Sequence, residues 1–166
     1  MQRSLESYGD VQEMQAHFEQ GLMPHQKERV EAVKARRRIL IADETGLRKT
    51  STGLACLEAT QVYPCAFVTL ASVEEDILRE CVQRLPWRSA GICNGSVPTT
   101  DIVILHPEVL ERHAMGLLRR GIKSVIVDEA HYYKNAGAAR SRALRDLADR
   151  CDVRILLTAT PIKNRR

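Results

Sequence analysis

Lys49 and Thr50 have the residue types and the spacing needed to bind phosphate. They follow a short apolar run, Ile39 to Ala42, of the kind that forms a buried parallel strand, and then a loop that contains Gly46. A helical pattern of apolar residues begins at Leu54. In such a strand–loop–helix unit, backbone N–H groups face the phosphates, the lysine reaches the terminal ones and the threonine hydroxyl ligates magnesium. The stretch therefore predicts a phosphate-binding loop.

The loop departs from the pattern G-x-x-x-x-G-K-[ST] at two positions. Asp43 stands where the first glycine would fall, and Arg48 stands where the second would fall. A side chain at position 48 would cost about 1–2 kcal/mol if that residue had to be left-handed. We therefore expect weak, magnesium-dependent binding of ATP or ADP that Arg48→Gly would tighten. The alternative interpretation is an ordinary connection between a strand and a helix.

Two further groups of polar residues follow buried apolar runs. Asp128 and Glu129 come directly after the run Ser124 to Val127, and open α/β sheets bind ligands at the carboxyl ends of their strands. Asp128 could hold magnesium, and Glu129 could orient and deprotonate an attacking water. Thr158 and Thr160 follow a later run and could hydrogen-bond toward these carboxylates. The alternatives are an acidic strand end that arose by chance and a strand-terminating turn.

Apolar patterning indicates which elements position these groups. Strands are expected at residues 39–42, 65–70, 102–105, 124–127 and 154–157, with one more short strand near 91–93. Helices are expected over residues 11–20, 24–34, 72–85 with a capping box at its start, 107–118 and 138–148, and after the phosphate loop. Buried strands that alternate with helices predict an α/β domain around a mostly parallel sheet.

Composition limits the class of protein. The 166 residues are 44% hydrophobic and 28% charged, which suits one domain, or one domain and a short appendage. Aromatic residues make up 4%, so the core must be aliphatic, and the five cysteines, which have no C-x-x-C spacing, are expected to be small buried hydrophobes. The formal charge of +4 permits an anionic partner without demanding one. The sequence has no apolar run long enough for a membrane span and no signal-peptide pattern, so we expect a cytoplasmic or nuclear protein that is not secreted.

Three strings, in this order, resemble motifs I, II and III of the Swi/Snf family of DNA-translocating ATPases, within superfamily two helicases. They are ADETGLRKT at 42–50, VIVDEAHYYKNAGAARSRAL with its DEAH string at 125–144, and ILLTATPIKNR at 155–165. Residues 22–26 are similar to the family's adenine-reading segment, residues 66–72 to motif Ia, and residues 101–107 to the next DNA-facing motif. The resemblance covers about residues 22–166 and implies a three-layer, RecA-like P-loop NTPase lobe. Residues 1–21 are expected to form a helical appendage.

The resemblance also implies roles for individual residues. It implies that ATP is bound by Gln26, at the adenine, and by a run of loop residues, Thr45, Gly46, Leu47, Arg48, Lys49, Thr50 and Ser51. Magnesium would be held by Thr50 and Asp128, and the catalytic residues would be Lys49, Asp128, Glu129 and His131. Coupling of the ATP site to DNA would pass through His131, Thr158, Ala159 and Thr160. The backbone of double-stranded DNA would be contacted by Ser72, Lys134 and Asn135. We add Arg140 to this expected surface, because all four residues follow strands at the carboxyl edge of the sheet; a solvated surface is the alternative.

Members of that family carry their remaining motifs and their arginine fingers on a second lobe, whereas this sequence ends at Arg166, directly after motif III. An arginine finger contributes about 10³–10⁵ in rate in related phosphoryl transfer, so this lobe alone is expected to hydrolyse ATP barely, if at all. The predicted function is therefore the ATP-binding lobe of a Swi/Snf-like translocase that hydrolyses ATP on double-stranded DNA only with a second lobe, in cis or in trans. The alternative is an ATPase-deficient half-motor that acts as a binding or inhibitory module on a partner protein or DNA.

Overall fold

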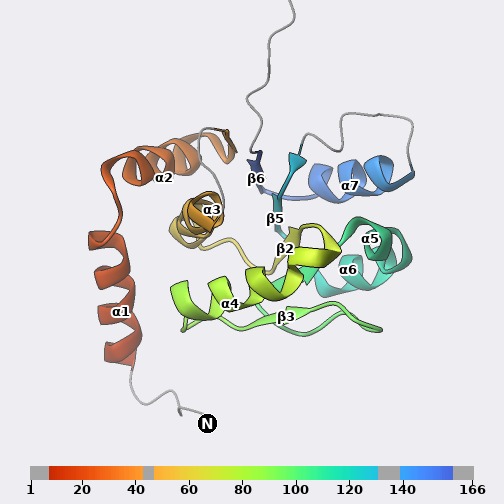
Figure 1. Ribbon diagram of the computed structural model, residues 1–166, viewed down its shortest axis with the longest axis horizontal. Coiled ribbons are helices and arrows are strands. Elements are labelled where there is room, and N and C mark those ends of the chain that lie inside the picture. Colours follow the sequence, from red (N-terminus) through yellow and green to blue (C-terminus); the bar gives the residue numbers. More distant parts are fainter. Residues whose placement is uncertain (1–7, 43–46, 131–138, 159–166) are drawn as a thin grey trace, which may run out of the picture.

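Helices and strands alternate in the computed structural model, which describes residues 8–42, 47–130 and 139–158 (Figure 1). In chain order the elements are α1 (Tyr8–Gln20), α2 (Pro24–Arg36), β1 (Arg38–Ile41), α3 (Leu47–Thr60), β2 (Cys65–Val68), the 3₁₀ helix η1 (Ala71–Val73), α4 (Glu74–Arg84), β3 (Ala90–Ile92), β4 (Ile102–Leu105), α5 (Pro107–Arg112), α6 (Ala114–Arg120), β5 (Ser124–Val127), α7 (Ala139–Asp149) and β6 (Val153–Leu157). Within these ranges, no helix is both long enough and apolar enough to cross a membrane.

The described strands form one sheet in the order β1-β6-β5-β2-β4-β3. Every strand pair in it is parallel, so the carboxyl ends of the strands meet at one edge of the sheet. Helices α2, α3 and α4 pack on one face, and α5, α6 and α7 pack on the other (Figure 1). This arrangement confirms the predicted α/β class with a parallel central sheet and three layers.

The inner strands β2, β4 and β5 are buried along their whole length, because helices cover both faces of the sheet there. Phe67 is the one aromatic side chain among the largest fully buried ones of the described residues, so the core is aliphatic, as predicted. All five cysteines are buried and free, which agrees with their expected role as small apolar residues.

Strand β1 differs from the fully buried strand that the sequence predicts. It lies at the end of the sheet, where β6 is its partner among the described strands. Leu40 on β1 is 39% exposed, and Leu156, beside it on β6, is 38% exposed. The prediction is wrong because an apolar run does not reveal whether a strand will lie inside a sheet or at its edge. Helix α7 packs on β5, and the described part of the chain leaves Leu40 on β1 and Leu156 on β6 exposed.

Two helices begin or divide at residues other than those predicted. The predicted capping box at Ser72 is wrong, because Ser72 lies in η1, α4 begins two residues later and no side chain caps it. Three acidic residues fill the first turn of α4 instead, where negative charge interacts favourably with the helix dipole. The single helix predicted for 107–118 is two helices, α5 and α6. They meet at His113, whose backbone leaves the helical region at φ −104°, ψ 15°.

Helix α1 is attached to the lobe by an aromatic contact and by a buried carboxylate. The rings of Phe18 and Trp87 meet edge to face with centroids 5.8 Å apart. Gln15 Nε2 donates to Glu58 Oε1 at 3.0 Å, and the same carboxylate accepts bonds from Gln61, Tyr63, Trp87 and Arg88. The predicted appendage of residues 1–21 thus contains a helix that packs on the core through Phe18. The division of the chain into an appendage of residues 1–21 and a lobe of residues 22–166 stays a prediction.

Candidate functional site

Lys49, Asp128 and Glu129 come together at the carboxyl edge of the sheet. Lys49 lies in the first turn of α3, and both carboxylates directly follow β5. Lys49 Nζ is 3.5 Å from Asp128 Oδ1 and 3.2 Å from Glu129 Oε1. Strand β6 lies between β1 and β5, so the parallel topology alone brings these distant parts of the sequence together. Lys49 is 3% exposed, which shields both ion pairs from water.

The carboxylate of Asp128 has three neighbours that favour its charged form. Besides Lys49, the Thr69 hydroxyl donates to Oδ2 at 3.1 Å and the backbone N–H of Glu129 donates to Oδ1 at 3.0 Å. Burial nevertheless raises the pKa of Asp128 above its ordinary value, and the charge of Glu129 adds to the rise, which Lys49 and Thr69 only oppose. The site therefore contains a carboxylate that a further cation would stabilise.

Glu129 has a left-handed backbone, with φ 56°. This conformation is uncommon for a residue other than glycine and costs of order 1–3 kcal/mol. The bond from its N–H to Asp128 supports the turn, and its side chain, 23% exposed, reaches Lys49 on one side and solvent on the other. Backbone strain of this kind clusters at functional sites, which supports a functional role for the turn.

Gln26 joins the N-terminal turn of α2 to α3. Its Oε1 accepts the backbone N–H of Met23 at 3.0 Å, and its Nε2 donates to Thr52 Oγ1 at 3.1 Å. An amide side chain has two N–H donors and two acceptor lone pairs, and these bonds use one of each. Within the part of the chain that the structure describes, one donor and one lone pair of Gln26 are not used, and Gln26 is held in place by the same helix that carries Lys49.

The first turn of α3 carries Arg48, Lys49 and Thr50, and Ser51 follows. Lys49, Thr50 and Ser51 are buried, whereas Arg48 is exposed. Arg48 has an ordinary helical backbone and is not among the residues with positive φ. The predicted backbone strain at Arg48 is therefore wrong, because the helix begins at Leu47 and includes the position that glycine occupies in the pattern.

Among the residues predicted to couple ATP to DNA, or to contact DNA, the structure describes Ser72, Arg140 and Thr158. Ser72 is exposed in η1, after β2, and Arg140 is exposed in the first turn of α7. Thr158 is buried after β6, and its backbone N–H donates to the carbonyl of Ile41 at 3.0 Å. Seven predicted site residues lie outside the described ranges: Thr45, Gly46, His131, Lys134, Asn135, Ala159 and Thr160.

Sequence reasoning did not identify Thr69 or Thr52 as site residues. Thr69 follows β2, which pairs with β5 so that Val68 lies beside Val127 and the threonine beside Asp128. The sequence does indicate a hydroxyl near the carboxyl end of a predicted strand at Thr69. Only the strand order shows that β5, and with it Asp128, ends beside this hydroxyl. Thr52 lies one turn of helix after Lys49 and had no signal of its own.

The fold and the cluster at its carboxyl edge define a RecA-like α/β lobe. A solved structure described as the Sulfolobus solfataricus SWI2/SNF2 ATPase core in complex with dsDNA matches with a TM-score of 0.75 over 87% of this chain and 33% of that chain, at 23% identity. At that identity, the likeness establishes the fold. The family model described as the SNF2-related domain matches residues 92–166.

Two curated relatives extend the match over most of the chain. The DNA annealing helicase and endonuclease ZRANB3 of Bos taurus is 30% identical over 96% of this chain. A Drosophila melanogaster protein named SWI/SNF-related matrix-associated actin-dependent regulator of chromatin subfamily A-like protein 1 is 29% identical over 87% of it. The chain belongs to the SNF2 family and corresponds to the N-terminal lobe of its ATPase domain. It spans 16% and 20% of the lengths of these two relatives.

Proposed function

We propose that this chain is the ATP-binding lobe of an SNF2-type, DNA-dependent ATPase that acts together with a second lobe. The observation that carries the proposal is the Lys49 ammonium, which lies in the first turn of α3 with two carboxylates 3.2 and 3.5 Å away. A helix N-terminus with a lysine suits phosphates, and carboxylates beside it suit a metal ion and a water. The SNF2-related family model covers Asp128 and Glu129, and a solved neighbour is described as a SWI2/SNF2 ATPase core.

The residues present fit a magnesium ion. The Asp128 carboxylate and the Thr50 hydroxyl are oxygen ligands of the kind that magnesium prefers, and both side chains belong to residues that are at most 8% exposed. A divalent cation would also favour the ionised form of Asp128, which burial disfavours. We assign Asp128 and Thr50 to magnesium, which in its bound state would neutralise charge on the phosphates.

Lys49 and Glu129 would change partners when nucleotide binds. Lys49 now lies between two carboxylates, and phosphate oxygens would compete for the same three N–H donors. As Lys49 turns to the phosphates, Glu129 becomes available to orient a water and accept its proton. Gln26 would contact the adenine through its remaining donor and lone pair. The buried ammonium therefore holds the two carboxylates in place before the reaction.

The DNA surface that we propose consists of Ser72, Lys134, Asn135 and Arg140. Exposure of Ser72 and Arg140, each after a strand and beyond its carboxyl end, supports this assignment. The solved neighbour is described as a complex with dsDNA, and the relatives are named as a DNA annealing helicase and a regulator of chromatin. We propose that this chain also acts on double-stranded DNA, in the cytoplasm or the nucleus, with a second lobe in cis or in trans.

The alternative of an ATPase-deficient binding module is not favoured by a specific observation. Its support in the sequence was the second lobe expected to be missing and Arg48, whose side chain could strain a left-handed backbone or clash with a phosphate. Arg48 instead has a helical backbone and is exposed, so it is compatible with a phosphate-binding turn.

The nucleotide proposal is tested by calorimetry with magnesium-ATP on the 166-residue chain. Lys49→Ala should weaken binding at least about tenfold, since it removes a charge-assisted bond worth about 1.5–3 kcal/mol. Lys123→Ala is the matched control, because Lys123 is exposed and lies just before β5, at the opposite edge of the sheet. Equal affinities in the wild-type and Lys49→Ala chains would contradict the assignment.

A further inference from the structure

Thr69 lies one residue beyond the carboxyl end of β2 and is fully buried. Its Oγ1 lies 3.1 Å from Oδ2 of Asp128. An ionised carboxylate can only accept hydrogen bonds, so the hydroxyl is the donor. Burial of a hydroxyl costs free energy unless it has a hydrogen-bond partner, and the Asp128 carboxylate is the partner that the fold supplies.

The sheet fixes the backbone of both residues. Strands β2 and β5 pair in parallel with Val68 beside Val127, and the ladder continues beyond them, because the Asp128 N–H donates to the Val68 carbonyl at 2.8 Å. On the other side of β2, the Thr69 N–H donates to the carbonyl of Leu105 on β4 at 3.0 Å. Thr69 is therefore held by β4 while its hydroxyl reaches across to the end of β5.

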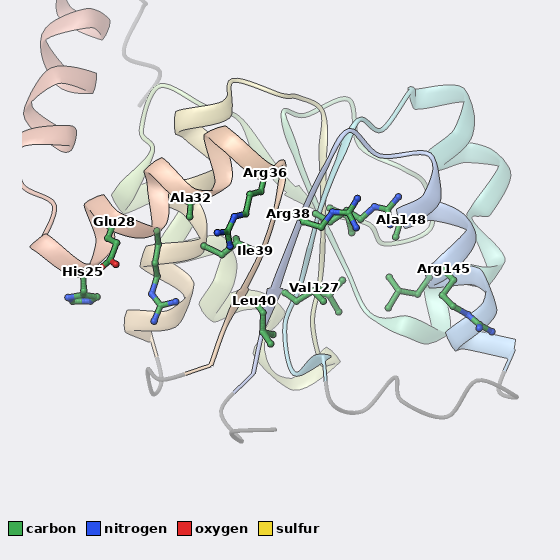
Figure 2. A pocket seen from close by; sticks show the side chains of 15 residues that line it. His25, Glu28, Ala32, Arg36, Arg38, Ile39, Leu40, Val127, Arg145 and Ala148 are labelled. Atoms are coloured by element: carbon green, nitrogen blue, oxygen red, sulfur yellow. The ribbon is translucent and has the colours of Figure 1, made fainter. Parts of the chain in front are cut away.

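Both side chains point to the face of the sheet that carries the nucleotide helix. Figure 2 shows Val127 among the side chains that line a hollow beside α7, and Val68 packs in the same cluster. Successive side chains of a strand point to opposite faces, so Thr69 and Asp128 point away from that hollow and toward α3. The 3.5 Å between Asp128 Oδ1 and Lys49 Nζ agrees with this direction.

The two oxygens of the Asp128 carboxylate have different surroundings. Oδ2 accepts the Thr69 hydroxyl, whereas Oδ1 accepts the N–H of Glu129 at 3.0 Å and lies near Lys49. Lys49 and Thr50 are consecutive residues in the first turn of α3. The terminal torsion of an aspartate is broad, so a carboxylate rotates easily unless both of its oxygens are held. The Thr69 bond therefore keeps Oδ1 turned toward α3.

We propose that Thr69 is a positioning residue for magnesium, because its hydroxyl holds the Asp128 carboxylate with Oδ1 toward the helix that carries Thr50. The inference rests on the proposed function, which assigns Asp128 and Thr50 to magnesium. Groups that bond to a ligating carboxylate orient it, and their loss typically lowers metal affinity about 10–100-fold. Thr69 acts through Asp128 and is not itself assigned to the metal or the nucleotide.

A purely structural role for the Thr69 hydroxyl predicts a different result. Loss of the bond would then lower the stability of the chain without changing how ATP binding depends on magnesium. Ser124 offers a matched comparison, because it is also fully buried and its Oγ donates to the carbonyl of Val62 at 2.7 Å. It begins β5, whose other end leads to Asp128, so Ser124→Ala removes a buried hydroxyl at the opposite edge of the sheet.

The test is calorimetry of ATP binding to the 166-residue chain, once with magnesium and once with EDTA. Thr69→Val keeps the β-branched shape and removes the hydroxyl. It should raise the Kd for magnesium-ATP at least about tenfold, the lower end of the range for such groups, and change the Kd in EDTA less than about twofold. Thr69→Ser keeps the hydroxyl and should retain the affinity of the wild type. Ser124→Ala should also retain it, although thermal unfolding should show lower stability.

Equal losses of affinity in both buffers, or unchanged magnesium-ATP affinity in Thr69→Val, would overturn the proposal. Thr69→Cys, whose thiol is a weak donor, should give an intermediate loss and serves the same test if the valine variant does not fold. A wild type that binds ATP equally in both buffers would overturn the magnesium assignment together with this inference. Lys49→Ala measured in EDTA tests the nucleotide site without magnesium, so failure of the proposed function is distinguished from failure at Thr69.

Discussion

At the scale of single residues, Asp128 and Lys49 decide the electrostatics of the site. Lys49 pairs with both carboxylates, yet burial still raises the pKa of Asp128 above its ordinary value. A carboxyl group with a raised folded-state pKa costs stability when it is ionised. The cost is absent below the unfolded-state pKa, about 3.9, and appears as the pH rises through the folded-state pKa. The ionised form of Asp128 is therefore less favourable in the folded chain than in the unfolded one.

Asp128→Asn should stabilise the chain at pH 7. The single amide oxygen can still accept one of the two bonds, from the Thr69 hydroxyl or from the Glu129 N–H, and Lys49 keeps Glu129 at 3.2 Å, while the buried negative charge is removed. We expect the free energy of unfolding to rise by about 0.5–2 kcal/mol, the usual gain from a single stabilising substitution. Thermal unfolding across pH measures it, and the gain should shrink as the pH falls toward 4, since Asp128 of the wild type becomes protonated. Asp152→Asn, at an exposed position, is the control. A less stable Asn variant at pH 7 would contradict this account.

Arg48 allows a comparison of two substitutions. Because its backbone is helical, Arg48→Ala and Arg48→Gly should change the affinity for magnesium-ATP by the same factor. The Gly variant should be less stable than the Ala variant by up to about 1 kcal/mol, the difference in helix propensity. Calorimetry and urea denaturation measure the two quantities. Tighter binding by Gly than by Ala would mean that strain at this position matters after all.

At the scale of elements, the buried carboxylate of Glu58 holds α3 in place. Arg88 donates through Nε at 2.9 Å and Nη2 at 3.1 Å, and its guanidinium lies 4.2 Å from the centroid of the Tyr63 ring. Burial raises the pKa of Glu58, but the bond from Arg88 and those from Tyr63, Gln61 and Trp87 together lower it below its ordinary value. Lys49 lies in the first turn of α3, and Glu58 lies near the end of the same helix. The bonds that Glu58 accepts therefore hold the helix that carries Lys49 against α1 and the segment before β3.

Glu58→Ala should destabilise the chain by about 1–3 kcal/mol, because it removes the shared acceptor of the half-buried Arg88 guanidinium and of several other donors. Urea denaturation measures the loss. Glu31→Ala is the control, since Glu31 pairs with Lys34 on an exposed face, where such pairs contribute less than about 1 kcal/mol. The lowered pKa means that the contribution of Glu58 is present above its unfolded-state pKa and is lost as the pH falls through the folded-state pKa. A similar loss of unfolding free energy in the two variants would show that the bonds to Glu58 do not stabilise the fold.

At the scale of the whole molecule, the candidate site lies at the carboxyl edge of the sheet, where the Glu129 side chain is 23% exposed. The described residues supply a lysine, two carboxylates and a glutamine, but no arginine among them contacts the carboxylates. Transfer of a phosphoryl group is stabilised by a cation placed opposite the lysine. We therefore expect the active unit to be larger than this lobe.

The 166-residue chain should show negligible DNA-stimulated ATP hydrolysis, and an added SNF2-type second lobe should raise the rate by about 10³–10⁵, the contribution of an arginine finger. Phosphate release with and without duplex DNA measures it, and the DNA stimulation should fall with added salt. Glu129→Gln should abolish the restored rate, whereas Glu75→Gln, at an exposed position on α4, should not. Robust turnover by this chain alone would contradict the need for a second lobe.

The sequence by itself determined the α/β class, nearly every strand and the motif residues, because apolar period and residue spacing are local properties. Cys65–Val68, Ile102–Leu105 and Ser124–Val127 follow from their apolar runs alone. Only the tertiary structure decided that β6 lies between β1 and β5, that Thr69 bonds Asp128, and that Glu58 gathers donors from α1 and from the segment before β3. It also decided that Leu40 is exposed and that Arg48 is unstrained. The physical reason is that strand order, sheet edges and helix starts depend on contacts between distant segments, which no local pattern contains.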